Sequence, residues 1–404
     1  MKLFRLFQKK QKKTVEEVLP QNDYYESISE KLGIAQVVLY LSLLAFVVLS
    51  FLRNTDLITY HNFYYFIKDL NASAETVDVW NTDSVSYPTD DVQSFTLYRD
   101  GLAVAGDSAV TVFTATGRQT ISQTITYHNP VAVGSGKYLL VYDLGGTKYS
   151  LYNSYTQIFS GECDYPISDG TVSKSGTYAL TSASSDYNSV VYLYNSNFSL
   201  INAYKKNGYV MDVAINPKGN SIALVTSTAK DGLFHTELLI SKIGETKATA
   251  TLNIAESLAL SCVFTGNDTV SILCSGGLYA YEANGNLINS YEFSGDTVAS
   301  FAVNASGHAV CLKSLGTSER RSVIVFDKRG STVYKGSADR QIDSMARYDD
   351  IIYLQTAYGV MRLDAKRGSY REELCNTEQT YLLAVGNKEF LLCSSKKATY
   401  MSFD

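Results

Sequence analysis

The stretch VAINPKGNSIALVTS, from Val213 to Ser227, consists of two runs of strand-forming residues that flank a turn at residues 217–219. Gly, Asn and Asp supply the positive φ angles of hairpin turns, so the stretch predicts a β-hairpin. A tight turn between two such runs occurs eight times, at intervals of roughly forty residues, the length of a four-stranded propeller blade. The eight turns lie at residues 99–101, 134–136, 174–176, 217–219, 266–268, 305–307, 348–350 and 386–388.

A second, weaker series of turns lies between the first, and its seven members begin at Thr114, Tyr152, Tyr194, Ser241, Glu282, Asp327 and Asp364. The eighth member would fall beyond Asp404, so we expect the last unit to lack its fourth strand. Residues 76–87 have strand character and precede the first unit, and pairing them with the last unit would remove two exposed edges. We therefore predict an all-β, eight-bladed β-propeller closed by an N-terminal strand; a seven-bladed ring is the alternative.

The run GIAQVVLYLSLLAFVVLSFL, at residues 33–52, carries no charge. Its length matches the ~20 residues that a helix needs to cross a bilayer, and the sequence after it has no signal-peptidase pattern, so we predict a transmembrane helix. A cluster of six basic residues, at positions 2, 5, 9, 10, 12 and 13, precedes this run, whereas only Arg53 and Lys68 follow it closely. Because cationic flanks stay in the cytoplasm, we expect a cytoplasmic N-terminus and an extracellular C-terminal domain.

These features divide the chain into four parts: a basic cytoplasmic tail (1–32), a transmembrane helix (33–52), an aromatic juxtamembrane linker (53–75) and the propeller (76–404). The linker contains the aromatic segment at residues 60–67, whose rings favour the headgroup layer and predict an interfacial anchor. The formal net charge is only -5, and the basic cluster lies at the N-terminus, so the composition does not favour nucleic-acid binding.

The repeat units VAINPKGNSIALVTS and VNASGHAVCLKS (from Val303) resemble those of quinoprotein-like (PQQ-like) and WD40-like propellers. With the apolar run in front, the chain resembles an uncharacterised family of single-pass membrane proteins of Gram-positive bacteria that carry an extracytoplasmic propeller, a family of unknown function. Quinoproteins hold their cofactor on a Trp floor and stack their blades with a Trp-containing motif. This chain has one Trp, Trp80, in the linker region, so the resemblance implies the architecture without a quinone.

Six cysteines lie outside the apolar run, at positions 163, 262, 274, 311, 375 and 393. Cys274, Cys311 and Cys393 fall on the same strand of their units, where other units have Ala, and equivalent positions around a ring are too far apart to be bridged. We therefore predict mainly free, buried thiols. Cys262 and Cys274 lie across one hairpin, and a disulfide between them remains open.

The sequence nominates no catalytic, cofactor-binding or metal-binding residue. The histidines, His61, His128, His235 and His308, are scattered over separate units without ligand spacing. The acid pairs Asp90–Asp91 and Asp349–Asp350 fall in predicted turns, where solvated turn chemistry explains them. Asn-x-Ser/Thr sites occur at Asn71, Asn197, Asn267 and Asn304, and they would be modified only in a eukaryotic secretory pathway.

Propellers present loops on two rigid faces, which suits recognition of a protein or a glycan. We expect a non-enzymatic binding or scaffold module at the cell envelope that contacts the bilayer through residues 33–52. One alternative is a sensor that relays ligand binding to a cytoplasmic partner through the tail. Another is a quinoprotein-like enzyme.

Overall fold

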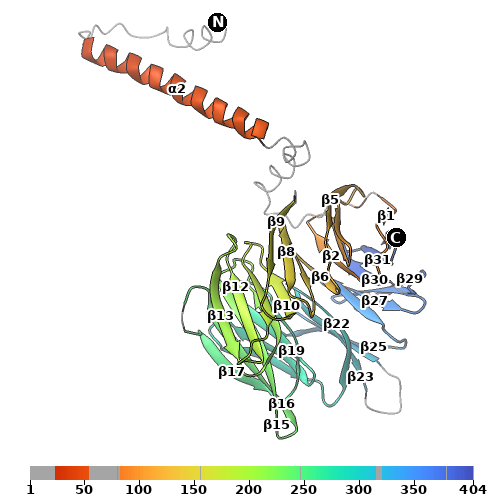
Figure 1. Cartoon of the computed structure of the whole chain (residues 1–404). Coiled ribbons are helices and arrows are strands. Elements are labelled where there is room, and N and C mark those ends of the chain that lie inside the picture. The colour runs from red at the N-terminus through yellow and green to blue at the C-terminus, as the bar shows by residue number, and fades with distance from the viewer. Residues whose placement is uncertain are drawn as a thin grey trace, which may run out of the picture. The chain divides into compact units, whose positions relative to one another are not determined.

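The computed structural model describes residues 23–53, 80, 82–99, 101–154, 156–245, 247–314, 321–378 and 380–403. The chain divides into two compact units, residues 1–66 and 67–404. Among the described residues, the first unit contains one helix, and the second contains all the strands (Figure 1).

Helix α2 (Asp23–Arg53) includes the predicted span at residues 33–52. Large apolar side chains such as Ile34 and Phe46 are exposed along this helix. The exposed apolar residues include the five consecutive positions 37–41, so they surround the helix. No helix in the described part of the chain combines the length and the apolar character needed to cross a membrane. The span therefore stays a prediction, and the aromatic segment at residues 60–67 lies outside the described residues.

The strands form eight four-stranded antiparallel sheets, the blades, and each of the first seven uses four consecutive strands. Blade 1 contains β2 (Gln93–Tyr98), β3 (Gly101–Gly106), β4 (Ala109–Phe113) and β5 (Gln119–Thr124); blade 2 contains β6 (Pro130–Ser135), β7 (Tyr138–Asp143), β8 (Lys148–Tyr152) and β9 (Gln157–Glu162); blade 3 contains β10 (Ile167–Val172), β11 (Tyr178–Ser182), β12 (Ser189–Tyr194) and β13 (Leu200–Lys206); blade 4 contains β14 (Tyr209–Ile215), β15 (Ser221–Lys230), β16 (Leu233–Lys242) and β17 (Ala250–Ala255).

The second half of the ring continues the same order. Blade 5 contains β18 (Ala259–Phe264), β19 (Thr269–Cys274), β20 (Gly277–Glu282) and β21 (Leu287–Glu292); blade 6 contains β22 (Thr297–Asn304), β23 (Gly307–Lys313), β24 (Arg321–Phe326) and β25 (Thr332–Ala338); blade 7 contains β26 (Ser344–Tyr348), β27 (Ile351–Thr356), β28 (Gly359–Asp364) and β29 (Ser369–Leu374); blade 8 contains β30 (Tyr381–Ala384), β31 (Glu389–Cys393), β32 (Lys397–Ser402) and β1 (Ser84–Ser86).

The first strands of successive blades form the inner wall of a closed ring. Strand β2 contacts β6, β6 contacts β10, and the series continues through β14, β18, β22 and β26 to β30, which contacts β2. A ring of eight such blades is an eight-bladed β-propeller, so the predicted fold class and blade number are confirmed.

Blade 8 joins the two ends of the propeller. Strand β1 pairs with β32, with Ser84 opposite Thr399 and Ser86 opposite Lys397, and it supplies the fourth strand that the C-terminal unit lacks. This strand lies within residues 76–87, of which the structure describes residue 80 and residues 82–87.

The two predicted series of turns correspond to two positions in the blades, the first in all eight and the second in blades 1–7. The first series joins the first and second strands, and the second series joins the third and fourth strands. At 216–221 the turn chemistry is clear, because the Gly219 N–H donates to the Asn216 carbonyl at 2.8 Å and Gly219 has φ 67°. A Cβ on residue 219 would approach the Ser175 hydroxyl of the neighbouring blade to 1.9 Å, so this turn requires glycine for packing as well as for φ.

The core lies between blades rather than within one layer. Eight clusters of buried apolar residues each fill one interface between neighbouring blades in the described part of the ring. Between blades 4 and 5, for example, Val225 and Leu238 pack with Phe264 and Ile272. Burying a Val, Leu, Ile or Phe side chain stabilises a fold by about 1.5–3 kcal/mol, so each blade depends on both neighbours.

Candidate functional site

The propeller has two faces with different loops. The A–B face carries the turns between first and second strands and between third and fourth strands. The B–C face carries the turns between second and third strands and the loops that join successive blades. Loops on a rigid scaffold are the usual binding elements of a propeller, so each face was a candidate site.

Exposed large apolar side chains gather on the B–C face. In the described part of the propeller, all but Leu200, Leu287 and Val303 lie at turns, loops or strand ends of that face; these are Val92, Leu144, Tyr165, Tyr209, Met211, Leu233, Phe234, Tyr358, Leu374 and Tyr381. Single exposed apolar residues are ordinary, but concentration on one face is typical of an interaction surface.

Blade 4 contributes the most prominent part of this surface. Strands β15 and β16 have ten residues each, longer than the other strands of the propeller, and their hairpin extends from the blade (Figure 1). The turn uses Asp231 and Gly232 with φ angles of 54° and 81°, as a tight two-residue hairpin requires. Directly after it, Leu233 and Phe234 are 50% and 47% exposed, and Tyr209 at the start of β14 is 62% exposed.

Blades 7 and 8 carry a second group of exposed apolar residues on the same face. Tyr358 is 68% exposed in the turn between β27 and β28, and Leu374 is 72% exposed opposite Gly359. The Arg340 guanidinium lies 5.5 Å from the Tyr358 ring centroid. Tyr381, at the start of β30, is 54% exposed. Aromatic side chains with an adjacent Arg are enriched at protein interfaces.

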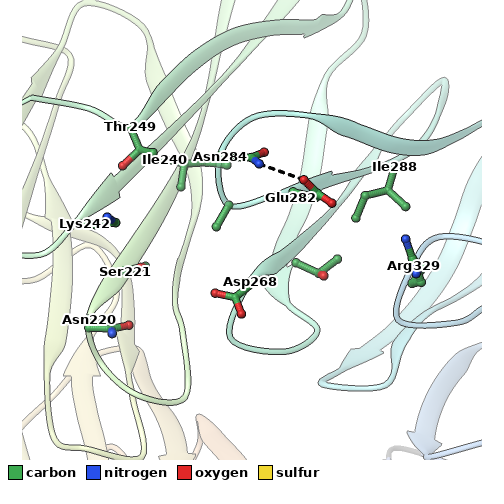
Figure 2. Close-up of a pocket in the computed structure, with 12 residues that line it drawn as sticks. Asn220, Ser221, Ile240, Lys242, Thr249, Asp268, Glu282, Asn284, Ile288 and Arg329 are labelled. Carbon is green, nitrogen blue, oxygen red and sulfur yellow. Dashed lines mark hydrogen bonds between the residues drawn. The ribbon is translucent and has the colours of Figure 1, made fainter.

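The A–B face has a polar pocket of about 640 Å³ between blades 4 and 5. Figure 2 shows the carboxylates of Asp268 and Glu282 between Lys242 and Arg329, which lie on opposite sides of the view. Amide and hydroxyl side chains such as Asn220 complete the polar lining, and Ile240 and Ile288 supply apolar patches; the full lining contains no aromatic ring.

Hydrogen bonds fix the Glu282 carboxylate in this pocket. Its Oε2 accepts from the Asn284 Nδ2 at 2.9 Å and from the Asn286 Nδ2 at 3.2 Å. These bonds and the charge of Arg329 lower the pKa of Glu282, so the group is ionised at neutral pH. A general acid needs the opposite shift, and the pocket is therefore better suited to binding than to acid catalysis.

Two aspartates form an acidic pair on the inner strands of blades 3 and 4. The Asp212 Oδ2 accepts from the Cys262 N–H of blade 5 at 2.7 Å, and its Oδ1 accepts from the Val213 N–H at 2.7 Å. The Asp169 Oδ1 accepts from the Gly170 N–H at 2.8 Å, whereas its Oδ2 is buried without a hydrogen-bond partner. Burial raises the pKa of both carboxyls, and the charge of Asp169 raises that of Asp212 further.

The Asp212 contact is one of several hydrogen bonds in which a polar side chain of one blade accepts a backbone N–H of the next blade. The Ser94, Ser189 and Ser227 hydroxyls each accept a backbone N–H from the inner strand of the following blade, at 3.1, 2.9 and 3.2 Å. Asp212 therefore connects neighbouring blades. Among the described residues, no group of three or more His, Cys, Asp or Glu side chains could hold a metal ion.

All six cysteines are free thiols, as predicted, and Cys375 is the one that is only half-buried. Cys262 lies opposite Ile272 and Cys274 opposite Ala259, so this hairpin register does not bring the two cysteines together as partners. Cys274, Cys311 and Cys393 do lie on second strands, but their positions are not strictly equivalent. Cys274 pairs with Ala259, which precedes the bulge in β18. Cys311 pairs with Ser300, which follows the corresponding bulge in β22.

The histidines lie apart, and His61 is outside the described residues. His308 is fully buried, with its Nε2 2.7 Å from the Ser261 hydroxyl and its Nδ1 3.0 Å from the Ser271 hydroxyl. Burial lowers its pKa to about 3, so it is a neutral core residue that connects blades 5 and 6. His128 is exposed beside the Asp143 carboxylate, and His235 lies on β16.

Trp80 is not a linker residue, contrary to the sequence-based interpretation. It is 4% exposed and belongs to the apolar cluster between blades 8 and 1, where its ring stacks on Tyr400 at 6.3 Å. The acid pairs lie in loops as predicted: Asp349 has φ 47° in a first-series turn, and Asp90 accepts a hydrogen bond from the Ser108 hydroxyl at 2.7 Å.

A closed ring of eight four-stranded blades defines the chain as a β-propeller protein. Residues 74–403 match the family of unknown function DUF5711, and the chain belongs to that family. No curated protein matches the sequence.

Solved structures show the fold at low sequence identity. BamB from Moraxella catarrhalis is 14% identical with a TM-score of 0.52, over 80% of this chain and 99% of that one. The C-terminal WD40 domain of Sif2 is 12% identical with a TM-score of 0.58, over 81% and 99%. A eukaryotic initiation factor is 13% identical with a TM-score of 0.53, over 80% and 85%.

Proposed function

We propose that this protein is a membrane-tethered, non-enzymatic module of the cell envelope that binds a partner protein through the B–C face of its propeller. The observation that carries the proposal is the concentration of exposed apolar side chains on that face, above all around the blade 4 hairpin. Interfaces are enriched in exposed aromatic and Met side chains of this kind, and a rigid hairpin loses little conformational entropy when it binds.

A protein partner explains the surface better than a glycan does. The polar pocket on the A–B face lacks an aromatic ring on which a sugar could stack. The apolar groups on the B–C face are spread over several blades, which matches the area of a protein interface rather than that of a small ligand.

The membrane tether rests on the first unit. Residues 33–52 form an uncharged run inside α2, with apolar side chains exposed around the helix. Exposed apolar side chains on this scale need a nonpolar environment, and a bilayer supplies one for a helix of this length. The six basic residues between positions 2 and 13 favour a cytoplasmic N-terminus, so the propeller lies outside the cell.

The partner proposal is tested by cross-linking in intact cells that produce the full chain. The chain with Leu233→Ser and Phe234→Ser should lose a discrete heteromeric cross-linked product that the unmodified chain gives. The matched control carries Leu200→Ser and Leu287→Ser, which remove similarly exposed leucines from the A–B face. Equal loss in both double variants, or no discrete product from the unmodified chain, would count against the proposal.

A further inference from the structure

One sector of the A–B face is strongly cationic. The first-series turns of blades 2, 3 and 4 carry Lys137, Lys174 and Lys218, and all three are exposed. The second-series turn of blade 4 adds Lys242 and Lys247. Among the described residues in the turns of this face on blades 2–4, the one acidic residue is Glu245, which lies 3.8 Å from Lys242.

Contacts between turns hold these lysines on one surface. The Tyr98 hydroxyl of blade 1 donates to the Lys137 carbonyl at 2.7 Å. A Cβ on Gly136 would lie 3.4 Å from Lys174, and the Thr177 hydroxyl donates to the Gly219 carbonyl at 3.4 Å. The three turns therefore adjoin one another, and the lysine sector (Lys137, Lys174, Lys218, Lys242 and Lys247) is continuous.

Outside this sector, the turns of the face carry charges of both signs. The first-series turns of blades 5 and 7 carry Asp268, Asp349 and Asp350. Basic residues also lie in other turns of the face, at Arg118 of blade 1, Lys328 and Arg329 of blade 6, Lys366 and Arg367 of blade 7 and Lys388 of blade 8. The sector over blades 2–4 is therefore part of a face with basic residues on most blades, and its described turns carry five lysines against one carboxylate, Glu245. Exposed polar turns in the same sector, at residues 195–199 and 216–220, add amide and hydroxyl groups that can donate to phosphate oxygens.

The N-terminal part of the chain joins the propeller at this same face. Strand β1 runs antiparallel to β32, and Ser86 lies opposite Lys397, directly after the B–C turn of blade 8. Ser84 therefore lies toward the A–B face, where a Cβ on Gly117 of blade 1 would lie 3.1 Å from the Thr82 side chain. In the sequence, residues 54–79 join this edge to α2.

We propose that the lysine sector binds the anionic phospholipid surface of the membrane that holds α2. This inference rests on the proposed tether. A tethered domain stays close to the bilayer, and each Lys near an anionic surface adds to binding. Charge complementarity and the point at which the chain joins both favour lipid over a soluble polyanion.

The test measures lysine acetylation in the full chain on vesicles, read lysine by lysine with mass spectrometry. One set of vesicles contains phosphatidylcholine alone, and the other also contains phosphatidylglycerol. We expect Lys137, Lys174 and Lys218 to react about fivefold more slowly on the anionic vesicles. The matched lysines of the B–C face, Lys148, Lys230 and Lys396, should react equally on both. Equal rates for the lysine sector on the two vesicles would overturn the inference.

Two further arms separate the possible outcomes. Full-chain Lys174→Glu/Lys218→Glu should lose the slowing at Lys137, whereas Lys230→Glu/Lys396→Glu should keep it. Equal protection of the sector by soluble inorganic polyphosphate without vesicles would overturn the choice of lipid.

Retention of the chain on phosphatidylcholine vesicles after an alkaline carbonate wash is measured separately. Loss of the chain from the vesicles in this wash contradicts the tether. Retention of the chain, with acetylation rates that phosphatidylglycerol does not change, contradicts only the proposed lipid binding by the lysine sector.

Discussion

The Tyr87 hydroxyl donates a 2.6 Å hydrogen bond to the backbone carbonyl of Ser394, 307 residues further along the chain. The Tyr87 N–H also donates to the Lys396 carbonyl, at 3.2 Å. These bonds continue the pairing of β1 with β32, and together they tie the start of the propeller to its last blade. Strand β1 covers the edge of β32 that a three-stranded last blade would expose.

Closure should therefore contribute to global stability. Val85 is 4% exposed between blades 8 and 1, so Val85→Asp would bury an unpaired charge. We expect a loss of several kcal/mol in the free energy of unfolding, measured by denaturant titration followed by circular dichroism. The control Lys396→Ala changes an exposed residue of the nearby turn and should alter stability little. A Val85→Asp variant as stable as this control would show that closure is dispensable.

The Asp169–Asp212 pair should make stability fall as the pH rises. Both native pKa values are raised, so the folded chain keeps protons that the unfolded chain has already lost above the ordinary aspartate range. Asp212→Asn removes one of the two charges, and its amide nitrogen can no longer accept one of the two backbone N–H bonds that the Asp212 carboxylate accepts. We expect the stability that is lost between pH 5 and pH 8 to be about 1–3 kcal/mol smaller in this variant than in the wild type, measured by thermal unfolding. Asp231→Asn, in the exposed hairpin turn, is the control; an identical pH dependence in both variants would be inconsistent with a coupled pair.

His308 should make the stability of the fold decrease as the pH falls, the opposite of the aspartate pair. Its native pKa is about 3, so from pH 6.5 downward the unfolded chain gains a proton that the folded chain does not. Wild-type stability should fall by about 1.4 kcal/mol per pH unit through this residue between pH 6.5 and 3. His308→Phe removes that dependence, and it costs about 2–5 kcal/mol at pH 7 because the Ser261 and Ser271 hydroxyls lose their partner. The exposed His128→Asn variant should do neither, and matching acid slopes in wild type and His308→Phe would exclude this role.

The thiols should be unreactive in the folded protein. Burial raises the pKa of Cys163 to about 11 and that of Cys274 to about 12, and five of the six thiols are buried. Only thiolates react quickly with aromatic disulfide reagents, so we expect Cys375 to react first and the others only after denaturation. Titration with such a reagent should give six thiols in denaturant without reductant. Fewer than six would reveal a disulfide.

Local chemistry explains which parts of the fold could be predicted from the sequence. A turn such as Asn216–Ser221 is determined by its own Pro, Gly and Asn residues, so the repeat and the blade count are readable without a structure. The missing fourth strand also follows from counting turns. The burial of Trp80 could not be predicted in this way, because its stacking partner, Tyr400, is at the other end of the sequence.

The sites depend on contacts that a single sequence does not display. The pocket brings Lys242, Glu282 and Arg329 together from three blades. In the sequence, each of these residues looks like an ordinary polar residue at or beside a turn of its own repeat unit. The lysine sector likewise emerges only when turns some forty residues apart adjoin one another. The length of β15 and β16 is a local signal, since residues 226–230 extend β15 before the Asp231–Gly232 turn and residues 233–235 extend β16 after it.

The most direct test of the central claim places one photoreactive benzoylphenylalanine on either face of the full chain in living cells. At position 234, on the B–C face, it should give a discrete adduct with one partner protein after irradiation. At position 287, on the A–B face, it should give none. A discrete adduct from position 287 alone, or the absence of any adduct from position 234, would contradict the account.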